Sequence, residues 1–305
     1  MKLLLNGRIT ASEEAVISVY DHGFLYGMGL FETFRTYGGR PWLLGLHAAR
    51  LAESCRALGI EYMPDPDRMA RDVRRLLEAN GLADAYVRWS VSAGEGEIGL
   101  RDRAYDRPAE IVYAKPVAPD RPETRAAKRV RLLRLPRSTP EGGPGAPRLK
   151  SFHYMNNMLA KRELAAGGAA PGTEGLFLGA DGDVCEGMVS NIFWIKDGVI
   201  HTPSLETGPL PGTTRAWVLA EGVRRIGGAA AMPAREGRYR WEELLRADEA
   251  FVTNAVQEIV PVAAFEEPDG TVRRLWPDGA GGITRRLMAA YRQAAEQESG
   301  SEDMR

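Results

Sequence analysis

The proline-rich segment at 115–122 is the feature that most restricts how this chain can fold. It reads Lys-Pro-Val-Ala-Pro-Asp-Arg-Pro, with three prolines in eight residues, and linkers of this composition are extended and stiff. The chain of 305 residues is long enough for two domains of about 150 residues each. We therefore predict an N-terminal domain over 1–116, a linker over 117–122, a C-terminal domain over 123–292 and a polar tail over 293–305 that is disordered from Glu296.

Both predicted domains combine helix and strand patterns. In the first, strands are predicted at Gly29–Tyr37 and Ala85–Ser92, and Asp67 is predicted to cap a helix that ends at Asn80. In the second, helices are predicted from about Ser151 to Ala166 and from Thr213 to Ile226, with short strands before, between and after them. These patterns predict an α+β fold, with mainly antiparallel strands in the N-terminal domain.

The charge balance and the cysteine content argue against several classes of protein. The chain has 40 basic and 41 acidic residues and a net charge of -1, so it has no basic excess for neutralising nucleic-acid phosphates. Cys55 and Cys185 form neither a disulfide framework nor a zinc-binding cluster. No stretch approaches the roughly 18 consecutive apolar residues of a membrane span. We expect a cytoplasmic protein that binds no metal, nucleic acid or membrane.

Several well-known catalytic motifs are also missing from the sequence. Gly27-Met28-Gly29 lacks the third glycine of a dinucleotide-binding turn, because Glu32 stands at that position. The chain has no GxxxxGK[ST] loop, no GxSxG elbow and no HExxH helix. Phosphoryl transfer, α/β-hydrolase chemistry and zinc peptidase chemistry therefore have no support in the sequence.

Lysine is scarce, with six lysines beside 34 arginines, so chemistry that needs a primary amine has few possible sites. Most lysines lie on solvated surfaces. Lys150, however, lies between a Pro/Gly-rich segment at 136–147, predicted to be a mobile loop, and the Asn- and aromatic-rich stretch 151–157. A lysine amine in apolar, aromatic surroundings has a lowered pKa and can attack an aldehyde to form a Schiff base. Binding of the cofactor pyridoxal phosphate requires such an amine.

Three further groups could bind the rest of that cofactor. Glu186 lies between two predicted strands and could keep the pyridine nitrogen protonated, although an ordinary turn glutamate has the same pattern. The segment 212–215, Gly-Thr-Thr-Arg, opens a predicted helix and offers amides and hydroxyls to a phosphate, although a threonine N-cap also occurs without a ligand. Arg50 could add positive charge or could be an exposed helix arginine.

These groups follow one another in a distinctive order: an arginine in a helix, a lysine, a glutamate and a Gly-Thr-Thr-Arg helix start. The sequence also carries the motifs Asp21 to Gly27, Phe31 to Arg35, Arg148 to Asn157, Glu186-Gly187 with Ser190-Asn191, and Thr253-Asn254. In these motifs the chain resembles the fold-type IV pyridoxal-phosphate enzymes, the class-IV aminotransferase family, and the resemblance covers nearly the whole chain, from Leu5 to about Pro261.

The resemblance implies a small N-terminal α/β domain and a larger C-terminal domain with a barrel-like β core. It implies that Lys150 attaches the cofactor and that Glu186 contacts the pyridine nitrogen. The other cofactor-binding residues that it implies lie on the phosphate side: Arg50, Thr213, Thr214 and Asn254. Family members usually pair as homodimers, so we expect a homodimer that acts on a small-molecule substrate.

Within the family, the sequence is most similar to lyases that convert 4-amino-4-deoxychorismate to 4-aminobenzoate and pyruvate for folate biosynthesis. Thr33 matches a threonine that these lyases place beside the cofactor, and we expect it to act with Lys150 in catalysis. Related D-amino-acid aminotransferases carry a carboxylate-binding arginine after the strand at 85–92, where this chain has Ala-Gly-Glu-Gly at 93–96. The alternatives are a branched-chain or D-amino-acid aminotransferase and, from another class, a cofactor-free binding protein on the same scaffold.

Overall fold

The structure, a computed structural model, describes residues 1–118, 120–138, 148–277 and 279–300. Residues 298–300 are described by their backbone alone. The chain divides into two compact units. Unit 1 consists of Met1–Pro119, Leu149–His153 and Ala295–Arg305, and unit 2 consists of Asp120–Arg148 and Tyr154–Ala294. The mobile loop predicted at 136–147 lies outside the described residues from position 139 onward.

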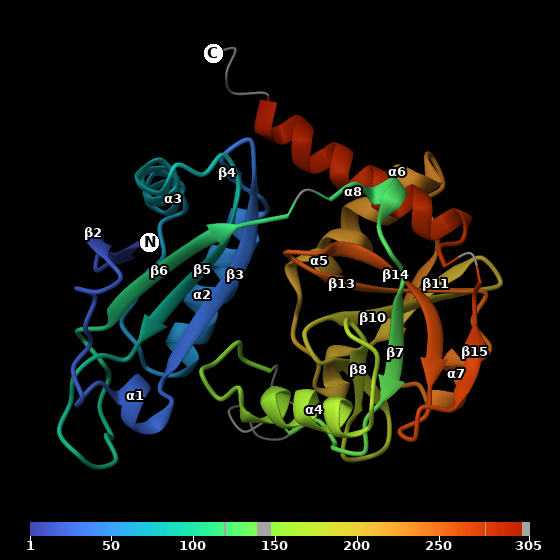
Figure 1. Cartoon of the computed structure of the whole chain (residues 1–305), viewed down its shortest axis with the longest axis horizontal. Coiled ribbons are helices and arrows are strands. Elements are labelled where there is room, and N and C mark those ends of the chain that lie inside the picture. Colours follow the sequence, from blue (N-terminus) through green and yellow to red (C-terminus); the bar gives the residue numbers. More distant parts are fainter. Residues whose placement is uncertain (119, 139–147, 278, 301–305) are drawn as a thin grey trace. The chain divides into compact units, whose positions relative to one another are not determined.

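Unit 1 contains an antiparallel sheet of six strands in the order β2-β1-β6-β5-β3-β4 (Figure 1). Asn6 and Gly7 join the first two strands and both have positive φ, the backbone conformation that a tight hairpin turn requires. The strands are β1 (Lys2–Leu5), β2 (Arg8–Ala11), β3 (Gly29–Tyr37), β4 (Arg40–Pro41), β5 (Ala85–Ser92) and β6 (Ala109–Pro116).

Helices of unit 1 cover one face of this sheet. The two that do so are α2 (Leu44–Ala57) and α3 (Pro66–Asn80), while the short α1 (His22–Tyr26) immediately precedes β3 in the chain. Helix α3 begins after Asp65, whose carboxylate accepts the amide of Asp67 at 3.0 Å, so Asp65 and not the predicted Asp67 is the cap. Alternate residues of β3 and β5, such as Phe34 and Trp89, pack against α2 and α3 in the core. The residues between them face the opposite side of the sheet.

The segment Leu149–His153 pairs with the first residues of β3, along the part of that edge that β4 does not occupy, since β4 pairs only with Thr36 and Tyr37. The amide of Phe31 donates to the carbonyl of Lys150, and the amide of Phe152 donates to the carbonyl of Gly29, both at 2.9 Å. The ring of Phe152 lies so close to Gly29 that a Cβ there would be 2.3 Å from it. Because the backbone around Ser151 pairs with β3, the helix predicted from Ser151 begins only at Met155, and that boundary was wrong.

Unit 2 contains a sheet of nine strands among its described residues, in the order β12-β11-β10-β13-β14-β7-β8-β9, with β15 paired to β14. Strand β9, at one end of this order, lies against β10 and β11 near the other end, so the sheet curls back on itself. Its strands are β7 (Lys128–Leu132), β8 (Glu174–Leu178), β9 (Val184–Gly187), β10 (Asn191–Lys196), β11 (Val199–Pro203), β12 (Ala234–Gly237), β13 (Glu249–Asn254), β14 (Glu258–Glu266) and β15 (Val272–Leu275).

The curled sheet encloses an apolar core, and helices lie outside it (Figure 1). The helices are η1 (Pro122–Thr124), α4 (Met155–Ala166), η2 (Leu205–Thr207), α5 (Thr213–Trp217), η3 (Val218–Gly222), α6 (Val223–Gly227), α7 (Trp241–Leu244) and α8 (Gly282–Gly300). Helix α8 continues through Gly300, so the disorder predicted from Glu296 is wrong up to that residue. The mixed architecture confirms the predicted α+β class.

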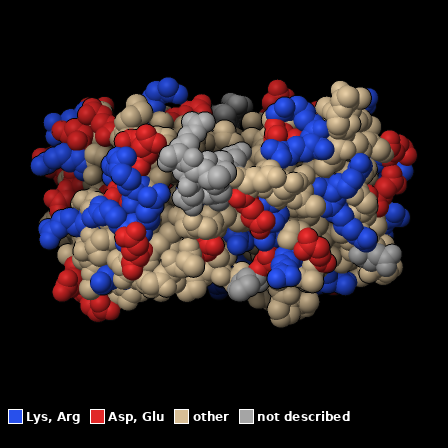
Figure 2. All heavy atoms as spheres, turned by 90° about the horizontal axis from the view of Figure 1, so that it is seen from above, with Lys and Arg blue, Asp and Glu red and all other residues tan. Residues whose placement is uncertain are grey.

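The surface carries both signs of charge. Acidic and basic side chains are scattered over the face drawn in Figure 2, in keeping with the net charge of -1. Among the described residues, no helix combines the length and the apolar character needed to cross a bilayer. The same residues include no group of three metal-ligating side chains.

Candidate active site

The seven residues singled out from the sequence divide between the two units. Lys150, Thr33 and Arg50 belong to unit 1, and Glu186, Thr213, Thr214 and Asn254 belong to unit 2. Lys150 is separated in sequence from the rest of unit 1, and its pairing with β3 brings it there.

Lys150 lies half-buried beside an aromatic ring. Its Nζ atom is 4.5 Å from the centroid of the Phe31 ring, and the face of an aromatic ring attracts a cation. Phe31 and Thr33 are two residues apart on β3, so their side chains share one face of the sheet. The structure therefore brings the predicted lysine and the predicted threonine to the same face, around Phe31.

Arg50 is held by a buried carboxylate. Its Nε donates to Oε1 of Glu32 at 2.8 Å and a terminal nitrogen donates to Oε2 at 2.5 Å. The Nδ1 atom of His47 lies 2.6 Å from the same Oε2. The Arg50 side chain is 11% exposed, so it is not an exposed helix arginine.

The pKa values of this cluster follow from burial and charge. Burial acts to raise the pKa of Glu32, yet this pKa is about 2 because Arg50 and His47 stabilise the carboxylate. Burial lowers the pKa of His47, and the charges of Arg50 and Lys150 lower it further. The hydrogen bond and the charge of Glu32 raise this pKa, but the net change is a decrease. We infer that a neutral His47 donates its Nδ1 proton to Glu32. Neither Glu32 nor His47 was predicted from the sequence as part of the Arg50 site. The spacing of His47 and Arg50 was an available signal, because residues three apart lie on one helix face.

Glu186 lies buried on β9 between two cations. Its Oε1 accepts from a terminal nitrogen of Arg148 at 2.9 Å and lies 2.9 Å from Nε of Arg137. Its Oε2 accepts the amide of Leu210 at 2.9 Å. These contacts compensate the cost of burying the carboxylate, so Glu186 is not a solvated turn residue. Arg137 also lies over the ring of Phe177, at 3.8 Å, and burial lowers its pKa.

Thr213 and Thr214 are buried at the start of α5. Gly212 precedes them and offers no side-chain cap, and the first amides of a helix have no acceptor within it. The hydroxyl of Thr214 lies 3.3 Å from that of Tyr291. A Cβ at Gly212 would lie 2.1 Å from Oδ1 of Asn191, so a larger residue there would displace the helix start.

Asn191 connects the groups of unit 2. Its Nδ2 donates to the carbonyl of Leu210 at 2.9 Å, while the amide of Leu210 donates to Glu186. Asn191 is also directly opposite Thr253 in the pairing of β10 with β13. The hydroxyl of Thr253 is buried and has no hydrogen-bond partner in the described part of the chain. Glu186, the α5 start and Thr253 are thus linked through Asn191 and its neighbours.

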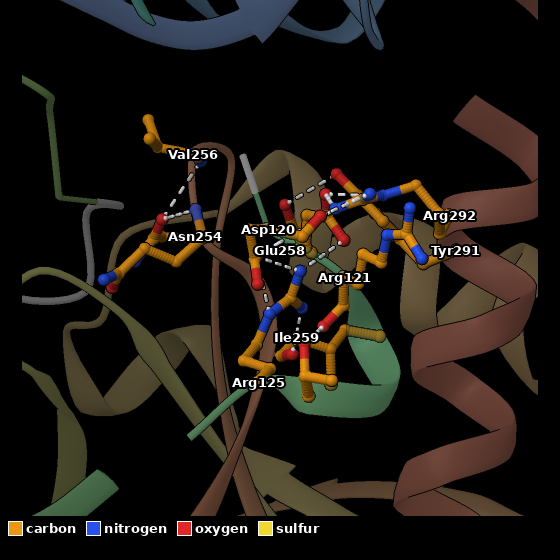
Figure 3. Close-up of polar contacts among 12 residues, drawn as sticks. Asp120, Arg121, Arg125, Asn254, Val256, Glu258, Ile259, Tyr291 and Arg292 are labelled. Carbon is orange, nitrogen blue, oxygen red and sulfur yellow. Dashed lines mark hydrogen bonds and ion pairs between the residues drawn. The ribbon is translucent and has the colours of Figure 1, made fainter. Parts of the chain in front are cut away.

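Asn254 stabilises the turn between β13 and β14 (Figure 3). Its Oδ1 accepts the amides of Val256 at 3.0 Å and Gln257 at 2.7 Å. Glu258 ends the turn with a φ of 65° and is completely buried. Arg125 donates to its carboxylate at 2.9 Å and Arg292 at 2.6 Å. The role that the structure shows for Asn254 is therefore to shape this turn.

These residues fit pyridoxal phosphate. In unit 1, Lys150 offers an amine against an aromatic ring; in unit 2, Glu186 offers a carboxylate and the start of α5 offers amides. The orphaned hydroxyl of Thr253 is a buried polar group that needs a partner. Arg50 offers an oriented cation for a phosphate.

Comparison with known proteins agrees with this chemistry. The family model "Amino-transferase class IV" matches residues 29–265. The aminodeoxychorismate lyase of Bacillus subtilis (strain 168) is 43% identical over 267 residues, 87% of each chain. The protein therefore belongs to the class-IV aminotransferase family of pyridoxal-phosphate enzymes.

Solved structures of the family share the fold. The 4-amino-4-deoxychorismate lyase from Pseudomonas aeruginosa superimposes with a TM-score of 0.78 at 31% identity, covering 96% of this chain and 99% of that one. The branched-chain amino acid aminotransferase from Thermobaculum terrenum, solved in its pyridoxal-phosphate (holo) form, gives a TM-score of 0.80 at 26% identity, covering 97% and 94%. Members of this family thus bind pyridoxal phosphate, and the predicted fold type is confirmed.

Proposed function

We propose that the protein is a pyridoxal-phosphate-dependent lyase that converts 4-amino-4-deoxychorismate into 4-aminobenzoate and pyruvate. The observation that carries the proposal is the 43% identity to the Bacillus subtilis lyase, over 87% of both chains. The common face of Lys150 and Thr33 supports it, because the reaction needs one group that takes a proton and one that returns it.

The site residues would have distinct tasks in binding the cofactor. Lys150 would attach it and Glu186 would hold a proton on the pyridine nitrogen. Its phosphate would be bound by Arg50, by the amides of Thr213 and Thr214, and on the side of the Asn254 turn. When bound, pyridoxal phosphate supplies an electron sink that acidifies the carbon bearing the substrate nitrogen.

The chain's own residues would then move one proton. The Nζ atom of Lys150, released from the cofactor when the substrate amine takes its place, would take it as a neutral amine from the carbon that bears nitrogen. The bond from the adjacent carbon to the enolpyruvyl oxygen breaks, and the ring becomes aromatic. Lys150 Nζ or the hydroxyl of Thr33 gives a proton to the departing oxygen, and the enol released becomes pyruvate. No atom is gained or lost overall.

An aminotransferase is the alternative that shares the first proton transfer. The chain is similar to branched-chain aminotransferases, and nothing in Lys150, Glu186 or Arg50 separates the two activities. The segment 93–96 contains no arginine, and the backbone at Gly94 approaches the carbonyl of Arg107 so closely that a Cβ would lie 2.1 Å from it. The lack of an arginine at 93–96 argues against transamination of D-amino acids in particular.

Two measurements test the proposal. Purified protein incubated with pyridoxal phosphate should show a visible absorption band that borohydride removes. The Lys150→Ala variant should lack this band. The control variant Lys161→Ala, at an exposed lysine of α4, should retain it. The holoenzyme should release 4-aminobenzoate and pyruvate from 4-amino-4-deoxychorismate without a keto acid. Conversion of amino acids that depends on a keto acid, with no such release, would show an aminotransferase instead. A protein that binds no cofactor would be a binding protein on this scaffold.

The proposal includes a homodimer formed through an apolar surface of unit 1. The loop 97–99 is joined to α1 by hydrogen bonds to His22 and Tyr26. Apolar side chains that are at least two-thirds exposed occur on this loop and just after it, on α1, and on the segment before α1: Val16, Val19, Phe24, Ile98 and Leu100. Light scattering should give twice the chain mass, and Val19→Glu with Phe24→Glu should give a monomer. Met63→Glu, at another exposed apolar residue, should leave the dimer intact.

A further inference from the structure

The glycines of the Gly27-Met28-Gly29 motif lie against two aromatic rings. A Cβ at Gly29 would be 2.3 Å from Cε2 and 2.5 Å from Cδ2 of Phe152, and a Cβ at Gly27 would be 2.3 Å from Cδ2 of His153. Carbon atoms in favourable contact are about 3.5–4.0 Å apart. Each ring therefore occupies space that only a glycine leaves open.

Both rings belong to residues that closely follow Lys150, and both residues are also hydrogen-bonded to the stretch that carries the glycines. The amide of Phe152 donates to the carbonyl of Gly29 at 2.9 Å. The Nε2 atom of His153 lies 3.0 Å from the carbonyl oxygen of Tyr26, and because a carbonyl can only accept, the ring donates its proton there. Shape and hydrogen bonds thus fix the same short segment.

The pairing of this segment with β3 is antiparallel. The amide of Phe31 donates to the carbonyl of Lys150 at 2.9 Å, so these two residues are opposite each other. Phe152 is opposite Gly29 in the same way. Residues two apart in a strand share one face, so the Lys150 amine, 4.5 Å from the Phe31 ring, lies on the face where Phe152 covers the glycine. A shift of one residue would turn Lys150 to the other face.

We propose that Gly29 and Phe152 form a lock that fixes the register of Lys150 on β3, which makes both of them positioning residues for the amine. An aromatic ring packed over a strand glycine pins strand register, and the side chain of Phe31 leaves no such space two residues further along. The requirement at Gly29 is one of space alone, because its φ is not positive, whereas that of Gly27 is 72°. The inference rests on the proposed function in that Lys150 attaches pyridoxal phosphate.

The rate at which the apoprotein attaches pyridoxal phosphate, followed by the visible absorption band, tests this lock. In Gly29→Ala the new methyl group must displace the Phe152 ring by about 1 Å or more. A misplacement of that size can cost about a hundredfold in rate, so the band should appear roughly ten- to a hundredfold more slowly. When Phe152→Ala has removed the ring, the same glycine substitution should change the rate by less than about threefold.

Hydrogen exchange of the apoprotein, measured by mass spectrometry, follows the lock without the cofactor. In Gly29→Ala the amides of 149–153 should exchange at least about tenfold faster, because their pairing with β3 opens more often. This added effect should disappear when Phe152 is also replaced by alanine. Gly45→Ala, on α2 where a Cβ would meet nothing within 4 Å, is the matched control and should alter neither measurement.

The possible results decide the inference. An equal effect of Gly29→Ala with and without the Phe152 ring, or no effect in either case, overturns the lock. If Gly29→Ala alone fails to fold, a double variant that behaves like Phe152→Ala supports the lock, and a double variant that also fails to fold overturns it. A wild type that forms no absorption band overturns the proposed role of Lys150 instead, and hydrogen exchange of the apoprotein still decides the lock.

Discussion

Arg50 and Glu32 form two parallel hydrogen bonds that fix the plane of the guanidinium, Nε to Oε1 at 2.8 Å and a terminal nitrogen to Oε2 at 2.5 Å. Arg50 comes from α2 and Glu32 from the helix-covered face of β3. A two-point contact of this kind restricts orientation as well as position. Glu32 therefore serves as a positioning residue for the arginine that would bind the cofactor phosphate.

Glu32→Gln should weaken the binding of pyridoxal phosphate about tenfold, because a loosened Arg50 loses a charge-assisted bond to the phosphate. The affinity for pyridoxal, which has no phosphate, should change much less. Fluorescence titration of the apoprotein with each compound measures both. Glu53→Gln, at an exposed residue of α2, is the matched control. An equal loss for both compounds would indicate general damage to the fold.

The same cluster should make stability fall at acid pH in two steps. The pKa of His47 is lowered in the folded protein from 6.5. As the pH falls below 6.5, His47 therefore becomes protonated in the unfolded chain but stays neutral in the folded protein, and the free energy of unfolding decreases. The pKa of Glu32 is lowered from 4.5 to about 2. Its contribution is complete above 4.5 and is lost as the pH falls toward 2. The loss due to Glu32 is on the order of 3 kcal/mol.

Urea unfolding over a pH series measures both steps. His47→Gln should remove the step near neutral pH, and Glu32→Gln should remove the step at lower pH. If both variants follow the wild-type curve, the cluster does not couple folding to protonation.

Glu258→Gln should destabilise the protein by about 3 to 5 kcal/mol, because it leaves Arg125 and Arg292 without their buried counterion. The free energy of unfolding in urea measures this loss. Asp181→Asn removes one member of a largely exposed pair with Arg238, and it should cost less than about 1 kcal/mol. Equal effects of the two substitutions would mean that the cluster of Glu258, Arg125 and Arg292 (Figure 3) contributes no more to the free energy of unfolding than a surface ion pair does.

Glu186→Gln should lower kcat on the order of a hundredfold or more, because an amide cannot keep the pyridine nitrogen charged. The cofactor should remain bound, since Lys150 and the phosphate-side residues are untouched. Steady-state kinetics at saturating substrate and the dichroism of the cofactor band measure the two effects. A variant with full kcat would remove Glu186 from the proposed mechanism.

Local sequence signals predicted much of the fold and part of the site. Strand β5 follows from alternation, β3 follows from a strand-like run that ends at Gly38-Gly39, and the end of α3 follows from Gly81, which adopts a φ of 64°. The scarcity of lysine and the order of motifs singled out Lys150 and Glu186. Asp67 as the cap and Ser151 as a helix start were wrong by two and four residues, because short polar residues give the same local signal within about one turn of the true boundary.

The partners of the site residues depend on contacts that are distant in sequence. No pattern in the sequence shows that Lys150 pairs with the edge of β3, that Glu32 meets Arg50, or that Arg137 and Arg148 flank Glu186. The sequence by itself determined which side chains can do the chemistry, since only an amine forms a Schiff base. The tertiary structure decided what surrounds each one, because strand register and burial select among many possible charged partners and local propensity does not.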